Sequence, residues 1–322
     1  MNMQIIELNP ERKQYIVNTA IGTAGGVAAC TWLPAQAGKM YGKYVFKHSK
    51  RVSAQEQQEY WKFGNAVLNQ SGLAAKGVII KDINLNNCDE IGNDIINKRK
   101  ALPQKKRSIL SKIFSKKNIS DEEYKARLRT YAEGRNACYI PAFSQVLVNK
   151  EKKSNAIFHE LGHAYNAKGT GFKKFMSGNR NKAIPLIPII LLTSLLTPSE
   201  DKNNPAQNKF YKSLLFLKKY SGLMVSACML PIVAEEGLAS INGAKLAKNI
   251  LPKNLYKKMN NFNAKAFASY TLWMICAGLG VTFANYVKDK VTGPLPSKMP
   301  KEGSNNQNIE EANADNHELI EK

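Results

Sequence analysis

The stretch AFASYTLWMICAGLGVTFANYV, residues 266–287, contains no charged side chain over 22 positions. A helix of this length rises about 33 Å, enough to cross a hydrocarbon layer of about 30 Å. Three further uncharged apolar stretches precede it: YIVNTAIGTAGGVAACTWLP (15–34), AIPLIPIILLTSLLTP (183–198) and YSGLMVSACMLPIVA (220–234). The sequence therefore predicts a mainly α-helical integral-membrane protein with about four apolar helices that span or enter the membrane.

The two middle stretches, 183–198 and 220–234, are shorter than the outer two, and both contain proline. Segments of this length can tilt, re-enter the membrane or pack as a hairpin inside protein. IPLIPIILLTSLL is more apolar than most soluble helices, which favours a membrane hairpin over 183–234. A hairpin buried in a protein core is the alternative.

The N-terminal apolar run has a second interpretation. Arg12 and Lys13 precede it, and VAAC ends at Cys30, which together resemble a lipoprotein signal that is cleaved before that cysteine. TWLP continues the apolar run past this point, which favours a transmembrane helix. The five cysteines form no CxxC pair, so we expect reduced thiols.

Basic residues predict the sidedness and an anionic partner. Lysine and arginine number 47 against 25 acidic residues, a net charge of +22. Residues 35–182 carry 29 basic and 12 acidic side chains, whereas the tail from 288 carries 5 and 7. The positive-inside rule then places the basic loops on the cytoplasmic face of a cell or inner membrane. Export of a lipoprotein would place them outside.

The segment 97–117, NKRKALPQKKRSILSKIFSKK, holds nine basic residues and no acid. Apolar residues at helical spacing within it suit an amphipathic segment on anionic phospholipid headgroups, and a solvated linker is the alternative. Nucleic acid is a less favoured partner, because no binding motif accompanies the charge. The tail 288–322 has few large apolar residues, and we expect it to be disordered.

The stretch AIFHELGHAYNA, 156–167, carries the candidate chemistry. A helix predicted over 154–168 places His159 and His163 one turn apart on one face, so both imidazoles can bind one zinc ion. Glu160 lies beside them. A metal lowers the pKa of its bound water, and a glutamate in this position can take the proton and pass it to the leaving amine of a peptide.

A third ligand is expected from VAEEGLAS, 233–240. Glu235 and Glu236 are the only acidic residues between Asp201 and Asp289. Two adjacent carboxylates at the mouth of an apolar segment are costly unless they have a partner. Helix capping is the alternative role for one of them. Catalytic zinc takes three protein ligands and keeps one position open.

These motifs resemble the HtpX-type gluzincins, a family of integral-membrane zinc metallopeptidases, over roughly residues 130–250. The resemblance rests on HELGH, an apolar hairpin, then EGLAS with AKL following. It implies Glu236 as third ligand, and Ser240 stands where the family has an aspartate that supports the ligands. Loss of such a partner commonly costs about 10 to 100-fold in metal affinity or activity.

The resemblance also implies a substrate-binding edge strand before the zinc helix. In the family an Asn-Ala pair leads into this strand, as NACYIPAFSQVLV does here. We place the strand at 143–148, so that Phe143, Ser144, Gln145 and Val146 pair with an extended substrate by β-augmentation.

The sequence thus predicts a membrane zinc endopeptidase with one zinc per chain, acting on polypeptides, with membrane-protein quality control as the role implied by the resemblance. A zinc-binding scaffold with weakened catalysis is the alternative. The predicted regions are a transmembrane helix (1–34), a basic cytosolic region (35–130), a metallopeptidase core (131–265), a transmembrane helix (266–287) and the tail (288–322).

Overall fold

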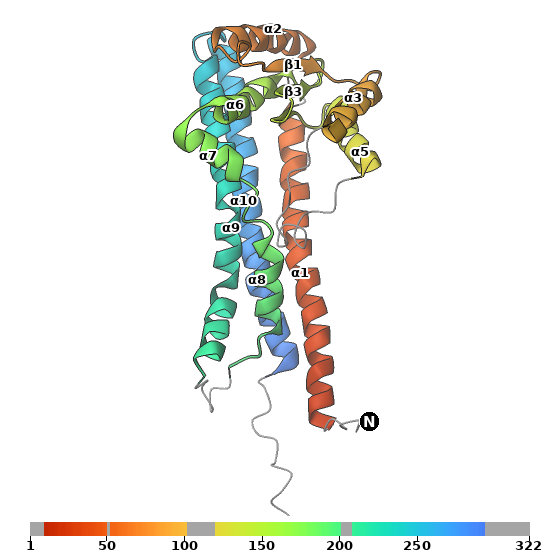
Figure 1. Ribbon diagram of the computed structural model, residues 1–322, viewed down its shortest axis with the longest axis vertical. Coiled ribbons are helices and arrows are strands. Elements are labelled where there is room, and N and C mark those ends of the chain that lie inside the picture. Colours follow the sequence, from red (N-terminus) through yellow and green to blue (C-terminus); the bar gives the residue numbers. More distant parts are fainter. Residues whose placement is uncertain (1–9, 50–51, 102–119, 201–207, 294–322) are drawn as a thin grey trace, which may run out of the picture.

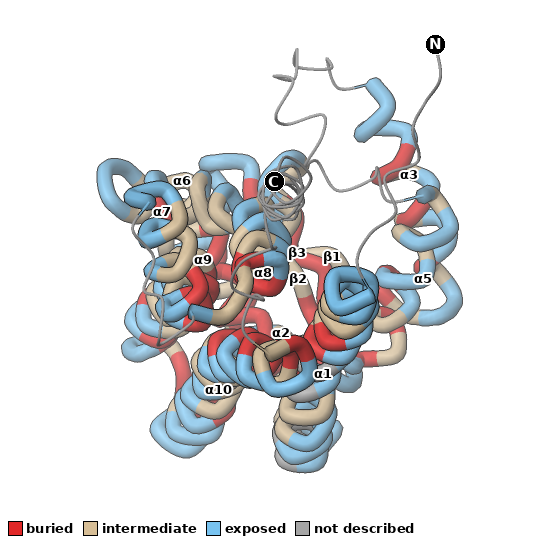
Figure 2. Tube along the Cα trace, turned by 90° about the horizontal axis from the view of Figure 1, so that it is seen from below, coloured by how far each residue is buried: buried red, intermediate tan, exposed pale blue. Residues whose placement is uncertain are grey.

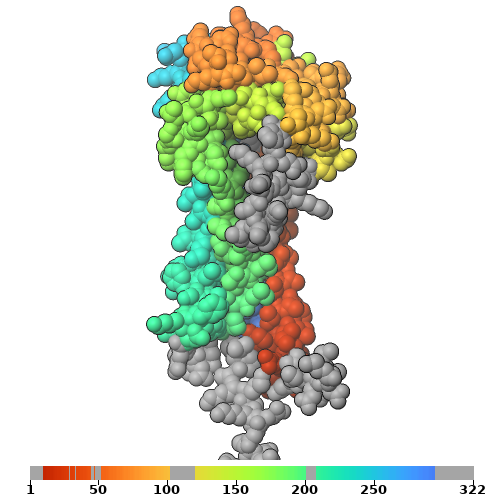
Figure 3. All heavy atoms as spheres, viewed as in Figure 1, coloured from red at the N-terminus to blue at the C-terminus, as the bar shows by residue number. Residues whose placement is uncertain are grey.

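The computed structural model describes residues 10–49, 52–101, 120–200 and 208–293, and they form a head carried on a helical stalk (Figures 1 and 3). The described residues are mainly helical, with one sheet of three strands. The segment 102–119, which includes most of the predicted polybasic region, lies outside the described residues, as does the tail from 294.

Three long helices build the stalk: α1 (Pro10–Ser49), α9 (Lys209–Ala247) and α10 (Lys253–Thr292). Each is long and apolar enough to cross a membrane. Three close contacts show that α1 and α10 run antiparallel: Gly22 packs against Lys288, Gly26 against Ala284, and Gly280 against Cys30. At these positions the missing side chain lets the two backbones approach closely.

Large apolar side chains remain exposed on the outer faces of the stalk. Figure 2 shows these faces as exposed, with buried residues mainly where the helices meet. The exposed residues include Ile16, Ile21, Trp32, Leu223, Leu230, Trp273, Ile275, Leu279 and Phe283. An apolar surface of this extent on the uncharged stretches of long helices is compatible with contact with lipid. The membrane association predicted from the sequence is therefore supported by the length and surface of three helices.

The fourth apolar stretch forms a shorter helix, α8 (Leu186–Leu196), of 11 residues. Its length is about 16 Å, roughly half of a hydrocarbon layer. α8 packs against α9 in the part of the stalk remote from the head (Figure 1). The hairpin 183–234 thus consists of one short helix and the first two thirds of a long one.

Two predicted region boundaries fall inside continuous helices. α1 runs 15 residues past the predicted boundary at 34 and contains Pro34. α10 begins at Lys253 and passes without interruption through the boundary at 265/266. Both helices therefore extend from the apolar zone into the head.

The head contains α2 (Ala54–Gln70), α3 (Cys88–Ala101), α5 (Asp121–Ala132), the short turn η1 (Ser154–Ala156), α6 (Ile157–Lys168) and α7 (Gly171–Asn179). α2 begins with a capping box, in which Ser53 accepts from the Glu56 amide and the Glu56 carboxylate accepts from the Ser53 amide. Its residue Tyr60 is buried against Phe158 of α6 and donates to the Leu255 carbonyl (2.9 Å). These contacts tie α2, α6 and α10 into one core.

The sheet has the order β1–β3–β2, with β1 at Ile79–Asp82, β2 at Cys138–Ile140 and β3 at Gln145–Val148. β3 pairs with β1 in parallel and with β2 in antiparallel register, and all four of its residues are buried. The predicted strand exists, but it lies in the centre of the sheet. The prediction that it is a free edge was wrong, because residues 79–82 occupy its second side.

Candidate metal centre

Helix α6 presents both histidines on its buried face. Its apolar residues Ile157, Phe158 and Leu161 stand at helical spacing and enter the core, and Gly169 ends the helix as its C-cap. His159 and His163 are each 8% exposed, and their rings meet edge to face. The same helix therefore fixes both imidazoles and the Glu160 between them.

Two glycines bring α9 against α6. A Cβ on Gly162 would collide with the Ala239 carbonyl, and a Cβ on Gly243 would collide with the Phe158 carbonyl. Only glycine permits this close backbone approach. The crossing places Glu236, one turn before Ala239, opposite the two histidines.

The three predicted ligands converge in the structure. The Nε2 atoms of His159 and His163 are 3.1 Å apart, and Oε2 of Glu236 lies 3.1 Å from the first and 3.4 Å from the second. In a tetrahedral zinc site with bonds of about 2.0–2.1 Å, two ligand atoms are separated by about 3.3 Å. The triangle thus has the dimensions of one face of such a tetrahedron, and this buried group could hold a metal ion.

The other ring nitrogens have partners that orient the imidazoles. Nδ1 of His163 lies 2.7 Å from Oε1 of Glu235, and Nδ1 of His159 lies 3.1 Å from Oγ of Ser240. Metal-binding histidines almost always make such a second hydrogen bond, which fixes the tautomer and the ring plane. Glu235 therefore supports His163, whereas the sequence left helix capping open as a role for one of the two glutamates.

Arg180, just after α7, joins the two carboxylates. Its Nη1 donates to Oε2 of Glu235 (2.7 Å) and its Nη2 donates to Oε1 of Glu236 (2.8 Å). Each glutamate therefore uses one oxygen toward a histidine and the other toward the guanidinium. The planar fork of arginine suits this bridging geometry, which a lysine ammonium cannot reproduce.

The charges of the cluster favour a cation. Two buried carboxylates face one guanidinium, and Glu160, a third buried carboxylate, lines the same cavity. Burial alone would lower the pKa of His163, but hydrogen bonds to Glu235 and Glu236 outweigh it and raise the pKa to about 10. A metal ion bound by His163 would therefore compete with a proton for this imidazole.

A cavity of about 580 Å³ adjoins the cluster. Glu160 lines it with the two histidines, and the opposite walls come from α1, β2 and α10. The residues contributed by these elements include Gly38, Gly42, Cys138, Tyr139, Tyr270 and Trp273. Its volume is sufficient for a peptide segment or a comparable ligand.

The residues predicted to bind substrate do not line this cavity. Phe143 and Ser144 lie in the turn between β2 and β3, and Ser144 has a φ of 51°. Gln145 and Val146 are buried and paired on both sides. Their neighbour β2, which includes the cavity residues Cys138 and Tyr139, is the edge strand beside the metal cluster.

The cavity residues Tyr270 and Arg180 were not predicted from the sequence, and Asn242, which follows Glu236 on α9, does not line the cavity. Asn242 instead donates to Asn166 (2.7 Å), which stabilises the α6–α9 crossing. One signal for Arg180 was present: it is the last arginine of a chain whose later basic residues are all lysine. A site in which one side chain donates to two carboxylates favours arginine over lysine at this position.

No protein-family model matches the chain, and searches of the curated proteins and of the solved structures give no significant match.

Proposed function

We propose that the protein is a membrane zinc endopeptidase. The observation that carries the proposal is the triangle of His159, His163 and Glu236 ligand atoms, held beside Glu160 at a cavity of about 580 Å³. Two nitrogens and one carboxylate oxygen are the ligands of a catalytic zinc site that keeps a position open. One zinc per chain is the expected stoichiometry.

A bound zinc ion would supply a coordinated water of lowered pKa and would polarise the carbonyl of the peptide bond. Glu160 takes a proton from the attacking water and delivers it to the amine that leaves, so that water is added across the bond. Tyr270 lies in the cavity beside Glu236 and provides a phenol that can donate to the oxygen on which charge develops.

The substrate is proposed to bind along β2. In the described sheet this strand pairs with β3 on one side, and its residues Cys138 and Tyr139 line the cavity. An extended polypeptide added to its other side would bring a peptide bond past Glu160. β2 thus replaces 143–146 as the proposed substrate strand.

The position of the metal cluster, where the apolar stretch of α9 meets the head, suggests that the substrates are attached to the membrane. Glu235 and Glu236 directly follow the apolar stretch 220–234, and Lys265 directly precedes the apolar stretch 266–287. A site at this boundary meets polypeptides held at the bilayer surface. The basic head favours the cytoplasmic face of a cell or inner membrane, and the family resemblance suggests quality control of membrane proteins.

Ser240 favours a second candidate function, a zinc-binding membrane scaffold that cleaves poorly. The hydroxyl lies 3.1 Å from Nδ1 of His159, where the resembling family has an aspartate. A neutral hydroxyl supports the imidazole less strongly than a carboxylate.

The substitution Glu160→Gln separates the two functions. The zinc-loaded parent protein, reconstituted in vesicles, is expected to cleave unfolded casein, whereas Glu160→Gln keeps its zinc and loses at least 100-fold in rate. Equal rates for parent and variant would contradict the peptidase. Zinc binding without cleavage by the parent would favour the scaffold.

A further inference from the structure

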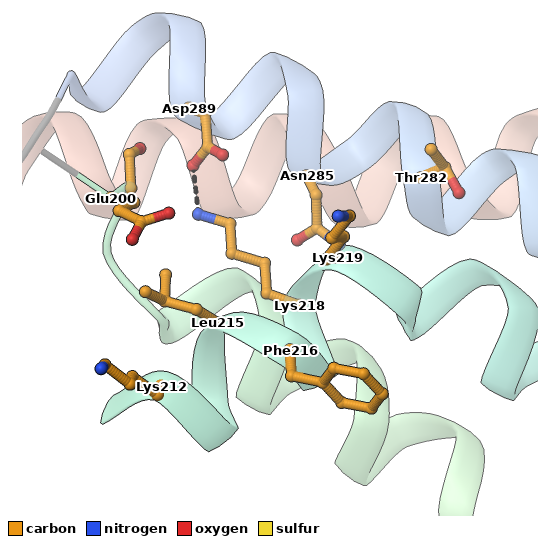
Figure 4. Close-up of a pocket in the computed structure, with 10 residues that line it drawn as sticks. Glu200, Lys212, Leu215, Phe216, Lys218, Lys219, Thr282, Asn285 and Asp289 are labelled. Carbon is orange, nitrogen blue, oxygen red and sulfur yellow. Dashed lines mark hydrogen bonds and ion pairs between the residues drawn. The ribbon is translucent and has the colours of Figure 1, made fainter. Parts of the chain in front are cut away.

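A second buried charged cluster lies at the end of the stalk remote from the head. Lys218 of α9 and Lys288 of α10 are 8% and 0% exposed. Lys218 forms an ion pair with Asp289, and both lysines donate to the Thr197 carbonyl, at 3.0 and 2.9 Å. Figure 4 shows Lys218 reaching from α9 to Asp289.

The cluster has an excess of positive charge. Two buried ammonium groups share one carboxylate, since Lys288 also lies 3.6 Å from Asp289. Lys212 and Lys219 lie on the same part of α9 and add two positive charges, whereas Glu200 adds one negative charge. Uncompensated buried charge is costly unless a ligand of opposite sign is bound.

A cavity of about 490 Å³ opens beside these side chains. Lys212, Lys218 and Lys219 line it, and so do two polar groups, Ser199 and Asn285. Ser199 Oγ and Asn285 Oδ1 are buried and find no hydrogen-bond partner among the described residues. The cavity therefore offers three ammonium groups and the Ser199 hydroxyl as donors to phosphate oxygens, beside the carboxylate of Asp289, which pairs with Lys218, and that of Glu200.

The cavity lies where a lipid headgroup is expected. Lys218 is two residues before the uncharged stretch 220–234, and Lys288 directly follows the stretch 266–287. Phe216 lines the same cavity and is 59% exposed, and Leu223, which is 69% exposed, follows two turns later on α9. Ammonium groups that suit a lipid headgroup thus lie next to an exposed apolar surface that suits acyl chains.

We propose that this cavity binds the phosphate of an anionic phospholipid from the leaflet remote from the head, with Lys212, Lys218 and Lys219 around the phosphate and the acyl chains along α9. The lipid neutralises the excess charge of the cluster and fixes α8 through Thr197, whose carbonyl both buried lysines contact.

The test uses the full chain in neutral detergent and counts bound dioleoylphosphatidylglycerol by native mass spectrometry. The parent is expected to retain one molecule per chain. The double substitution Lys212→Ala and Lys219→Ala removes two exposed lysines outside the buried hydrogen-bond network, and it is expected to weaken retention roughly tenfold. Lys253→Ala with Lys257→Ala removes the same charge at the head end and is expected to have no effect.

Equal retention by the parent and the Lys212/Lys219 variant would overturn the proposal. Equal retention of dioleoylglycerol, which lacks phosphate, would overturn the headgroup assignment. Displacement of the lipid by millimolar inorganic phosphate would show a site for free anions instead. An unchanged thermal unfolding temperature of the variant serves as the control for folding, so this test is independent of zinc binding and of the peptidase activity.

Discussion

Helix α9 carries two buried charged clusters, at opposite ends of its apolar stretch. The head cluster contains Glu235 and Glu236, and the far cluster contains Lys218, 17 residues earlier or about 25 Å along the helix. The head cluster is acidic around two imidazoles, whereas the far cluster is basic around one carboxylate. In each cluster, the charge that the protein neighbours leave uncompensated is opposite in sign to the ligand proposed for that cluster.

The clusters also differ in how firmly the protein holds them. In the head cluster each carboxylate bonds both a histidine and Arg180, so geometry is fixed by side chains from α6, α9 and the residue after α7. In the far cluster both lysines pair with the same carboxylate, that of Asp289, and both donate to the same carbonyl, that of Thr197. We therefore expect ligand geometry to be strict at the head end and permissive at the far end.

The largest effect should come from Glu236→Gln, compared with Lys218→Met in the other cluster. Loss of the carboxylate ligand is expected to lower zinc affinity at least 100-fold, because two imidazoles alone leave the site incomplete. Lys218→Met should leave zinc content unchanged. Titration with a chromophoric chelator measures both. Equal zinc affinity in the two variants would contradict the assignment of zinc to the head cluster.

A large loss is also expected from Gly162→Ala, because its Cβ would collide with the Ala239 carbonyl and force α6 from α9. The variant should lose about 3 kcal/mol of stability and most of its metal. Gly25→Ala is the matched control, since nothing lies within 4 Å of a Cβ at that position. Thermal unfolding of both variants in the same detergent gives the comparison.

A smaller effect should follow from Arg180→Lys. The ammonium keeps the charge but cannot donate to both carboxylates in parallel, so we expect zinc affinity to fall about 10 to 100-fold. The zinc affinity of Arg180→Met should fall further, because this substitution also removes the positive charge. An affinity for Arg180→Lys equal to that of the parent would mean that charge, and not the fork, positions Glu235 and Glu236.

The smallest effect on metal should come from Lys153→Met in the cavity wall. Lys153 is 4% exposed, and burial lowers its pKa from 10.5 to about 8. The unfolded chain therefore binds more protons between these values, and stability should rise as pH increases from about 8, by roughly 1 kcal/mol per unit. Lys153→Met should remove this rise while zinc content stays the same. A parent whose stability falls over this interval would contradict the assignment.

Local patterns predicted the parts of the site that one segment determines. The spacing in AIFHELGHAYNA predicted the helix and the common face of His159 and His163, and the isolation of Glu235 and Glu236 among apolar residues predicted a third ligand. The apolar stretches predicted the stalk helices, because hydropathy over 20 residues is a local property.

Features that depend on contacts between distant segments were not predictable in this way. FSQVLV indicates a strand, but its central position depends on pairing with residues 79–82, more than 60 residues earlier. Arg180 joins Glu235 and Glu236 across 55 and 56 residues. No local periodicity encodes either contact, and the helices α2, α3 and α5 of the region 35–130 were likewise not assigned.

The convergence of His159, His163 and Glu236 on one metal ion is tested most directly by X-ray absorption spectroscopy of the purified, zinc-loaded protein. The structure predicts nitrogen and oxygen ligands at about 2.0–2.1 Å with the outer scattering of two imidazoles, and loss of this signal in His163→Ala. Sulfur ligands at about 2.3 Å, or an unchanged spectrum in that variant, would place the metal elsewhere and contradict the account.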